Sequence, residues 1–363
     1  MKVKTEYPRG FLVALFLLLM GTINLDAQDT INVYGVVDTI SLDFDIFTEE
    51  DPASITLAFN IKEFIRNSDE DKYFDARLTY LLDDSAKIEK DIRIKARGKN
   101  RRDVCSFPPL WLNIGKADID NKYFGDVKKI KLVTHCNSGN VNSANVLKEY
   151  LVYKMYNILS PYSFRVRLVK VKYIDTGKDN KEIDTWGFLI EPEEMVAQRL
   201  NAFALDYDHI GYELADQEET DIMSMFQYII GNADYSILSR QNVKLLKLND
   251  IDRPQPIPVP YDFDYSGFVN PAYAIPGDNL GISSVTERYF LGPCRSVERY
   301  NELFEYFFSK KEEIYMLIES FGYLDDRTKK VALKFLDSFF MYAGKKGYIQ
   351  NNLLPTCRGV KVK

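Results

Sequence analysis

The sequence predicts an α+β fold of two lobes, with a β-rich N-terminal lobe over residues 28–191 and a mainly helical C-terminal lobe over residues 192–363. Three observations support this prediction. Apolar and polar residues alternate through much of the first half, as in strands with one solvated face. Apolar residues recur at helical spacing in the second half. Between the two patterns lies Glu191-Pro192, and Pro192 is suited to open a helix.

The first 27 residues indicate a secretory signal peptide. Basic residues precede an unbroken apolar run over residues 11–20, which is too short to span a bilayer comfortably, and Ala27 is small enough for cleavage. An uncleaved membrane anchor is the alternative. We expect an exported protein, either periplasmic, on the outer surface or secreted, without stable membrane insertion after signal cleavage.

Composition narrows the class of protein. The 363 residues are 46% hydrophobic, which supports a real core, and carry a net charge of −6 without a basic block, which argues against a nucleic-acid partner. An even number of cysteines in an exported chain indicates disulfides. Three pairings are possible, and we favour Cys105–Cys136 and Cys294–Cys357 because each pair lies within one half of the chain. Two histidines and no CxxC motif argue against a zinc site.

In the first half, the patterns predict strands and one inserted helix. The helix, over residues 146–159, should bury Leu151 and Met155 between the sheet and the helical half. The alternation changes phase near Leu168, which predicts a β-bulge. The expected strands cover residues 31–37, 55–60, 74–82, 88–97, 110–114, 130–133, 164–173 and 185–190.

In the second half, helical spacing dominates. One predicted helix ends at Gly231, a residue that readily adopts the left-handed conformation beyond a helix end. A strand is expected over residues 243–248. The expected helices cover residues 193–200, 222–230, 297–319 and 325–343.

A basic turn follows the strand over residues 88–97. Glycine in this turn lets backbone N–H groups approach an anion, and arginine side chains match phosphate geometry. The alternative is a solvated hairpin tip. The basic residues are Arg97, Lys99, Arg101 and Arg102.

Acidic and amide groups recur in the second half. Asp262 and Asp264 flank an aromatic residue, and in an extended segment both would point to one face and could meet one cation. Carboxylates suit hard cations such as Mg²⁺ or Ca²⁺. Asp234 precedes them, and Asn242 opens the strand over residues 243–248. A structural Ca²⁺ site or a capped turn are the alternatives for the two aspartates.

This order of elements and groups is that of protein kinases. The chain resembles the spore-coat H (CotH) kinase-like family, a group of atypical secreted kinases, and its secreted bacterial relatives. The resemblance covers residues 88–345. The motifs that carry it are Arg97-Gly98, Phe107-Pro108, the Leu-x-Tyr pattern in residues 148–157, Gly187-Phe188-Leu189-Ile190-Glu191, Asn232-Ala233-Asp234 and Asp262-Phe263-Asp264.

The resemblance implies a bilobal protein-kinase-like fold and a role for each matched residue. Asp234 would accept the proton of an acceptor hydroxyl. The metal, Mg²⁺ or else Mn²⁺ or Ca²⁺, would be held by Asn242, Asp262 and Asp264. ATP would be bound by backbone groups of Ile190 and Glu191 at the adenine, and by Arg97, Lys99 and Arg102 at the phosphates.

One departure leaves a role open. Where family members carry lysines after the Phe-Pro motif, this chain has Pro109 and Leu110, so the phosphate-pairing lysine is unassigned. Lys131 could take that role by pairing with Glu149. An ordinary outward-facing position for Lys131 is the alternative.

The implied function is that of an exported kinase-like phosphotransferase. It would use ATP and a divalent metal to modify a hydroxyl of a secreted or surface protein. The alternative is a catalytically inactive kinase-like module that binds a nucleotide, a glycan or a protein partner. The sequence leaves open whether the protein is an enzyme.

Overall fold

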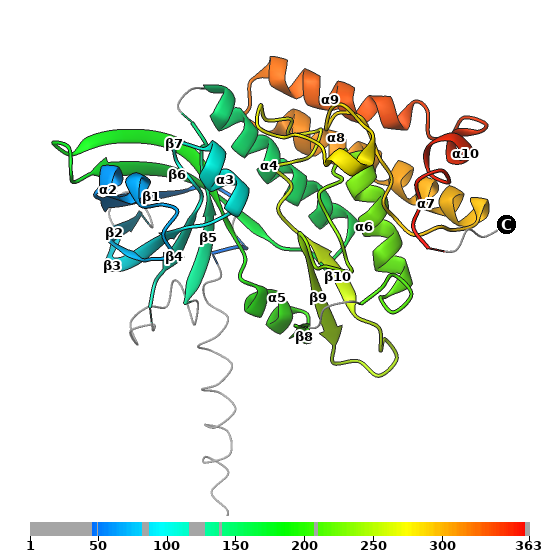
Figure 1. Ribbon diagram of the computed structural model, residues 1–363, viewed down its shortest axis with the longest axis horizontal. Coiled ribbons are helices and arrows are strands. Elements are labelled where there is room, and N and C mark those ends of the chain that lie inside the picture. Colours follow the sequence, from blue (N-terminus) through cyan, green and yellow to red (C-terminus); the bar gives the residue numbers. More distant parts are fainter. Residues whose placement is uncertain are drawn as a thin grey trace, which may run out of the picture. The chain divides into compact units, whose positions relative to one another are not determined.

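Seven strands close into a barrel in the order β1-β2-β3-β4-β5-β7-β6 (Figure 1). Neighbouring strands are antiparallel except β1 and β6, whose parallel pairing closes the barrel. The strands are β1 (Ala53–Phe59), β2 (Phe74–Leu81), β3 (Lys87–Ala96), β4 (Leu110–Asn113), β5 (Lys129–Val133), β6 (Val166–Asp175) and β7 (Lys181–Ile190).

The computed structural model describes residues 46–48, 50–81, 87–115, 128–137, 140–206 and 210–359. The predicted signal peptide and the predicted strand over residues 31–37 lie outside this range. Residues 45–363 form one compact unit.

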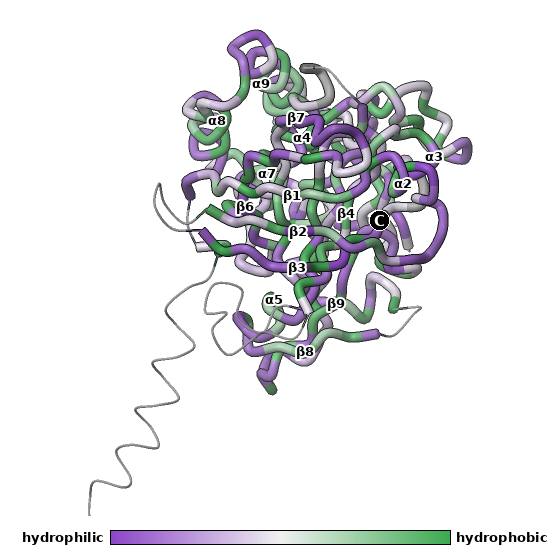
Figure 2. Tube along the Cα trace, turned by 90° about the vertical axis from the view of Figure 1, so that its left-hand side faces the viewer, coloured by the Kyte–Doolittle hydropathy of each residue, from purple (hydrophilic) through white to green (hydrophobic). Residues whose placement is uncertain are grey.

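The alternation predicted for β2 and β3 is confirmed. Ala76, Leu78 and Tyr80 of β2 are buried, as are Ile92 and Ile94 of β3. Figure 2 shows β1, β2 and β3 side by side, with hydrophobic and hydrophilic residues interspersed along them. One face of this part of the barrel therefore faces the core.

The predicted bilobal kinase-like fold is wrong. The strands close into a seven-stranded barrel, and residues 45–363 form one unit instead of two lobes. A single hydrophobic cluster contains Leu168 and Phe188 of the barrel together with Phe226 and Phe339 from helices of the second half. The closing pair β1–β6 joins segments far apart in the chain, and alternation within a strand does not identify its partner.

Helix α4 (Asn140–Leu159) joins the barrel to the helical part. It ends at Leu159 as predicted but begins six residues before the predicted start at position 146. It contacts β6, β7 and α8 (Lys311–Ser320) (Figure 1). Leu151 and Met155 are buried, with exposed fractions of 0% and 1%, so the predicted apolar face is confirmed.

Strand β6 has no bulge. Its pairing with β7 runs without interruption from Val166 opposite Ile190 to Asp175 opposite Lys181. Val166, Leu168 and Val169 are all buried. The change of phase in the sequence therefore reflects burial on both faces of the strand, and the predicted bulge is wrong.

The second half holds a small sheet and the remaining long helices. Strands β8 (Ala202–Leu205), β9 (Val243–Leu248) and β10 (Ile257–Pro260) pair in the order β10-β9-β8. Gly231, at φ 67°, follows the end of α6 as predicted. The helix predicted over residues 297–319 is two helices that meet at Lys310. The remaining α-helices of this half are α5 (Glu193–Arg199), α6 (Gln217–Ile229), α7 (Val297–Ser309), α9 (Asp326–Phe340) and α10 (Tyr348–Asn352), and the first half also contains the short helix α2 (Ile61–Arg66).

Both predicted disulfides are confirmed. Cys105–Cys136 joins the end of the short helix α3 (Lys99–Val104) to the segment after β5, and Cys294–Cys357 closes the C-terminal region. Such bonds are typical of proteins outside the cytoplasm. Within the described residues, none of the helices combines the length and the apolar character needed to cross a membrane.

Candidate functional site

The antiparallel pairing of β9 and β10 brings two predicted site residues to the same end of the small sheet. Val243 pairs with Pro260, so Asn242 precedes β9 where Asp262 follows β10. The N–H of Tyr261 donates to the carbonyl of Asn242 at 3.0 Å. Asn242 (φ 53°) and Asp262 (φ 62°) both have left-handed backbone conformations. Such conformations are costly for residues other than glycine and cluster at functional sites.

Asp234 is fixed by two neighbouring amides. The side-chain nitrogen of Asn242 donates to the Asp234 carbonyl at 2.7 Å and to its Oδ2 at 3.0 Å. The side-chain nitrogen of Gln241 donates to Oδ1. Burial, together with the charge of Asp262, raises the pKa of Asp234, although the two amide bonds lower it. Because the nitrogen of the Asn242 amide faces Asp234, its oxygen is turned away from that carboxylate.

These groups line a cavity of about 170 Å³. It combines residues that follow β3 with residues from two loops of the second half. Five predicted site residues, Arg97, Asp234, Asn242, Asp262 and Asp264, are therefore brought together. The complete lining is Arg97, Gly98, Arg101, Pro109, Asp234, Gln241, Asn242, Asp262, Asp264 and Tyr265.

Two arginines face two aspartates across this cavity. Arg97 Nη2 lies 3.8 Å from Asp262 Oδ2, and Arg101 Nε lies 3.8 Å from Asp264 Oδ2. Both distances are too long for hydrogen bonds, so the charges are balanced without direct donation. Asp264 accepts a hydrogen bond from the hydroxyl of Tyr273 at 3.0 Å. Burial, followed by the charge of Asp262, raises the pKa of Asp264 to about 6.

A buried aromatic residue anchors the acidic segment. Phe263 is 0% exposed, and its ring lies 4.7 Å from that of Tyr153 and 5.9 Å from that of Phe226. The N–H of Asp262 donates to the hydroxyl of Tyr153 at 2.8 Å. Packing in the core and one hydrogen bond to α4 thus hold Asp262 and Asp264 at the cavity.

Glu149 faces Arg101, a member of the predicted basic turn to which the sequence assigned no individual role. Its Oε2 lies 3.7 Å from Arg101 Nη1. Burial, with the charge of Asp264, raises the pKa of Glu149 well above its usual range. A signal for Arg101 exists in the sequence, because in a helix it shares a face with Cys105 four residues later, and the disulfide turns that face inward.

Lys131 does not pair with Glu149. Its ammonium lies 4.4 Å from the ring centre of Tyr261 and 5.5 Å from that of Trp111. Burial, followed by the positive charge of Arg97, lowers the pKa of Lys131 to about 7. Lys131 is therefore neither an ordinary outward-facing residue nor the partner of Glu149.

Two further residues that were predicted to bind the phosphates, Arg102 and Lys99, are placed differently. Arg102 Nη1 donates to the carbonyls of Ser68 and Asp69, at 3.5 and 3.2 Å, and does not line the cavity. Lys99 begins α3, and its side chain lies outside the described part of the structure.

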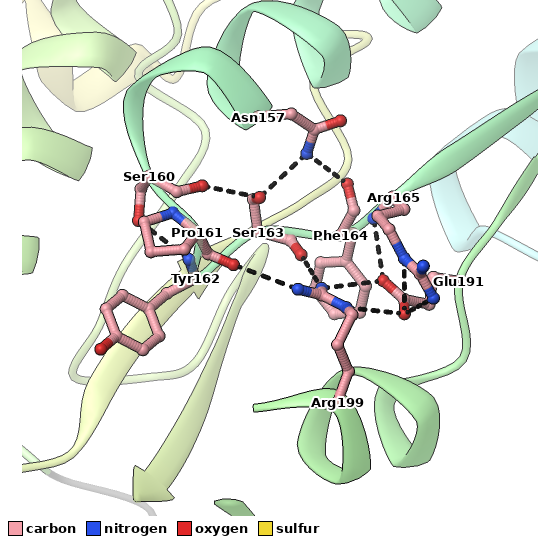
Figure 3. Close-up of polar contacts among 9 residues, drawn as sticks. All are labelled: Asn157, Ser160, Pro161, Tyr162, Ser163, Phe164, Arg165, Glu191 and Arg199. Atoms are coloured by element: carbon pink, nitrogen blue, oxygen red, sulfur yellow. Dashed lines mark hydrogen bonds and ion pairs between the residues drawn. The ribbon is translucent and has the colours of Figure 1, made fainter. Parts of the chain in front are cut away.

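Glu191 belongs to a hydrogen-bonded network away from the cavity (Figure 3). Its carboxylate accepts from Arg165 Nη2 at 2.6 Å and from Arg199 Nη2 at 3.0 Å. Its backbone N–H donates to the Arg165 carbonyl at 3.0 Å, so this N–H is not available to an adenine. Ile190 pairs with Val166 and Lys131 within the barrel.

The candidate metal ligands are one amide and two carboxylates. Among the described residues, no group of three or more histidine, cysteine, aspartate or glutamate side chains is arranged to hold a metal ion.

In comparisons with known proteins, no family model matches this chain and no curated protein matches it.

Proposed function

We propose that the cavity binds the phosphates of ATP together with a divalent cation, and that the protein transfers the terminal phosphoryl group to a hydroxyl of an exported protein. The observation that carries this proposal is the convergence of Asp234, Asn242, Asp262 and Arg97 on one cavity from separate segments of the chain. Phosphoryl transfer depends mainly on positioning and charge neutralisation, which such a set provides. The proposal keeps the activity that the resemblance to the CotH family implies, but not the bilobal fold that it implies.

The residues present fit a hard divalent cation. Asp262, Asp264 and the amide oxygen of Asn242 supply oxygen ligands of the kind that Mg²⁺ prefers. The arginines lie 3.8 Å from the two carboxylates and donate no hydrogen bond across these gaps, so they leave oxygen lone pairs open to a cation. When bound, the cation neutralises phosphate charge.

The chain's own residues position the acceptor and the phosphates. Gln241 and Asn242 orient the carboxylate of Asp234, and burial raises its pKa toward that of a useful proton acceptor. Arg97 lies beside Asp262, and its guanidinium matches the planar arrangement of phosphate oxygens. Asp234 is therefore assigned to the hydroxyl proton, and Arg97 to the phosphates.

The test separates binding from transfer. Calorimetry with ATP and Mg²⁺, Mn²⁺ or Ca²⁺ should show metal-dependent binding that Asp262→Ala abolishes. Asp234→Asn should retain binding but lose transfer of labelled phosphate to exported proteins. The exposed Asp278 provides a control, because Asp278→Ala should change neither. Metal-dependent transfer by Asp234→Asn at the wild-type rate would contradict the proposal.

A second candidate is the inactive binding module. It is favoured by the two arginine–aspartate pairs, which balance the charge of Asp262 and Asp264 without any metal. This alternative predicts nucleotide binding that chelation of metal leaves unchanged, with no transfer by the wild-type protein.

A further inference from the structure

We infer that Arg101 is the principal phosphate-binding residue of the cavity, and that it receives phosphoryl oxygens on Nε and Nη1. This inference rests on the proposed phosphate-binding function and adds a residue to it. The Arg101 side chain is 8% exposed and lines the cavity. Among the described residues, neither Nε nor Nη1 has a hydrogen-bond partner, and both atoms are buried.

Unpaired donors on a buried guanidinium are costly, and an entering anion would satisfy them. The third nitrogen, Nη2, already donates to the carbonyl of Thr134 at 3.0 Å. Glu149 and Asp264 balance the charge of Arg101 from 3.7 and 3.8 Å without hydrogen bonds. The open N–H groups of Nε and Nη1 point in different directions, so they can donate charge-assisted hydrogen bonds to two separate phosphoryl oxygens.

The available space favours a phosphate in the larger cavity. Arg101 also lines, with Glu149 and Tyr273, a cavity of only about 10 Å³. That space suits at most one water molecule, because a water requires about 10–15 Å³. The cavity of about 170 Å³ has room for a phosphate group.

The fold holds Arg101 in place before any ligand arrives. Arg101 lies in α3, and its carbonyl accepts a hydrogen bond from the N–H of Cys105 at 2.9 Å. Cys105 is joined to Cys136, two residues after Thr134, the partner of Nη2. A disulfide and a hydrogen bond thus fix both ends of the segment that carries the guanidinium, which reduces the cost of ordering it on binding.

The neighbouring Arg102 provides a matched control. It lies in the same short helix, but it donates to the carbonyls of Ser68 and Asp69 and does not line the cavity. Arg101→Lys keeps the positive charge but removes the separate N–H donors of the guanidinium, whereas Arg102→Lys makes the same change outside the cavity.

The experiment measures binding of inorganic tripolyphosphate and of ATP with Mg²⁺ by calorimetry. We expect Arg101→Lys to weaken tripolyphosphate binding by about tenfold or more, and Arg102→Lys to change it less than about twofold. Equal affinities for wild type and Arg101→Lys would overturn the inference. Wild-type binding that Arg101→Lys weakens, without any phosphate transfer, would support the inference and overturn the proposed activity.

A measurement on the wild-type protein covers the case in which Arg101→Lys does not fold. Tripolyphosphate should slow hydrogen exchange of the amides in residues 98–105, while a control peptide over residues 191–199 should not change. Unchanged exchange in residues 98–105 at saturating tripolyphosphate would overturn the inference. Binding of neither tripolyphosphate nor ATP would overturn both proposals.

Discussion

Two buried glutamates, both of which the sequence assigned to the nucleotide-binding site, differ in their surroundings. The Glu191 side chain is 0% exposed and accepts hydrogen bonds from Arg165 and Arg199 at 2.6–3.1 Å (Figure 3). The Glu149 side chain is 3% exposed, but the cationic atom that faces it, Arg101 Nη1, lies 3.7 Å away. Within the described residues, Glu149 Oε1 has no hydrogen-bond partner.

The contrast separates a structural network from a binding site. Buried polar groups are almost always hydrogen-bonded, so an unsatisfied group in a native structure needs an explanation. Glu191 ties the start of β6 to α5 and has no open positions to offer a ligand. Glu149 and Arg101 have open positions and lie next to the cavity. We therefore assign stability to the first glutamate and ligand binding to the cluster that contains the second.

The largest effect should come from breaking the Glu191 network. Glu191→Gln leaves Arg165 and Arg199 without their shared carboxylate, and removing one partner of a buried ion pair costs roughly 3–5 kcal/mol in the free energy of unfolding. Urea denaturation of the wild-type protein and of Glu191→Gln measures this cost.

Glu149→Gln is the matched control for that change. Asp264 still balances Arg101 from 3.8 Å, and burial already disfavours the charged form of Glu149. We expect a stability change within about 1 kcal/mol, since Oε1 of Glu149 has no hydrogen bond to lose. Equal losses in the two variants would remove the distinction between the networks.

The two disulfides also test the distinction between structural stability and ligand binding, because they are the same kind of bond in different parts of the fold. Each should contribute about 2–4 kcal/mol to stability by restricting the unfolded chain. Replacing Cys105 and Cys136 by serine should also weaken tripolyphosphate binding, because this bond holds the helix that carries Arg101. Replacing Cys294 and Cys357 should lower stability alone, because this bond closes the C-terminal region and not the segment that carries Arg101. Equal binding losses in the two double variants would point to general destabilisation.

The sequence predicts local features, such as which strand residues are buried, better than it predicts which segments pair with one another. Alternation located Ala76 and Ile92 in the core because burial on one face has a period of two residues. The order of Asp234, Asn242 and Asp262 indicated a shared site, and the structure brings their side chains to one cavity.

The sequence alone could not predict the closure of the barrel or the hydrogen-bond partners of individual side chains. The parallel pairing of Ala53–Phe59 with residues 169–175 depends on three-dimensional register, so the fold class was predicted wrongly. Arg101 and Arg102 are the same residue type in adjacent positions, but the helix turns only one of them into the cavity. Chemical type alone could not separate them.

The remaining prediction is a pH dependence that arises from Asp264, which faces Arg101. Burial and Asp262 raise the pKa of Asp264 from 3.8 to about 6. The folded state therefore favours protonated Asp264, and this contribution to stability is present below about pH 4 and is lost as the pH rises through about 6. A bound cation has the opposite requirement, because it needs the ionised carboxylate.

Affinity for Mn²⁺-ATP should therefore fall as the pH drops below about 6, by up to about tenfold for each pH unit for this one group. Asp264→Asn should bind more weakly at neutral pH and should lack this part of the pH dependence, which calorimetry at several pH values can measure against wild type. The comparison with the variant cancels the titration of the nucleotide itself, which both proteins share. Identical pH profiles would show that Asp264 remains protonated or takes no part in binding, and would restrict the cation to Asn242 and Asp262.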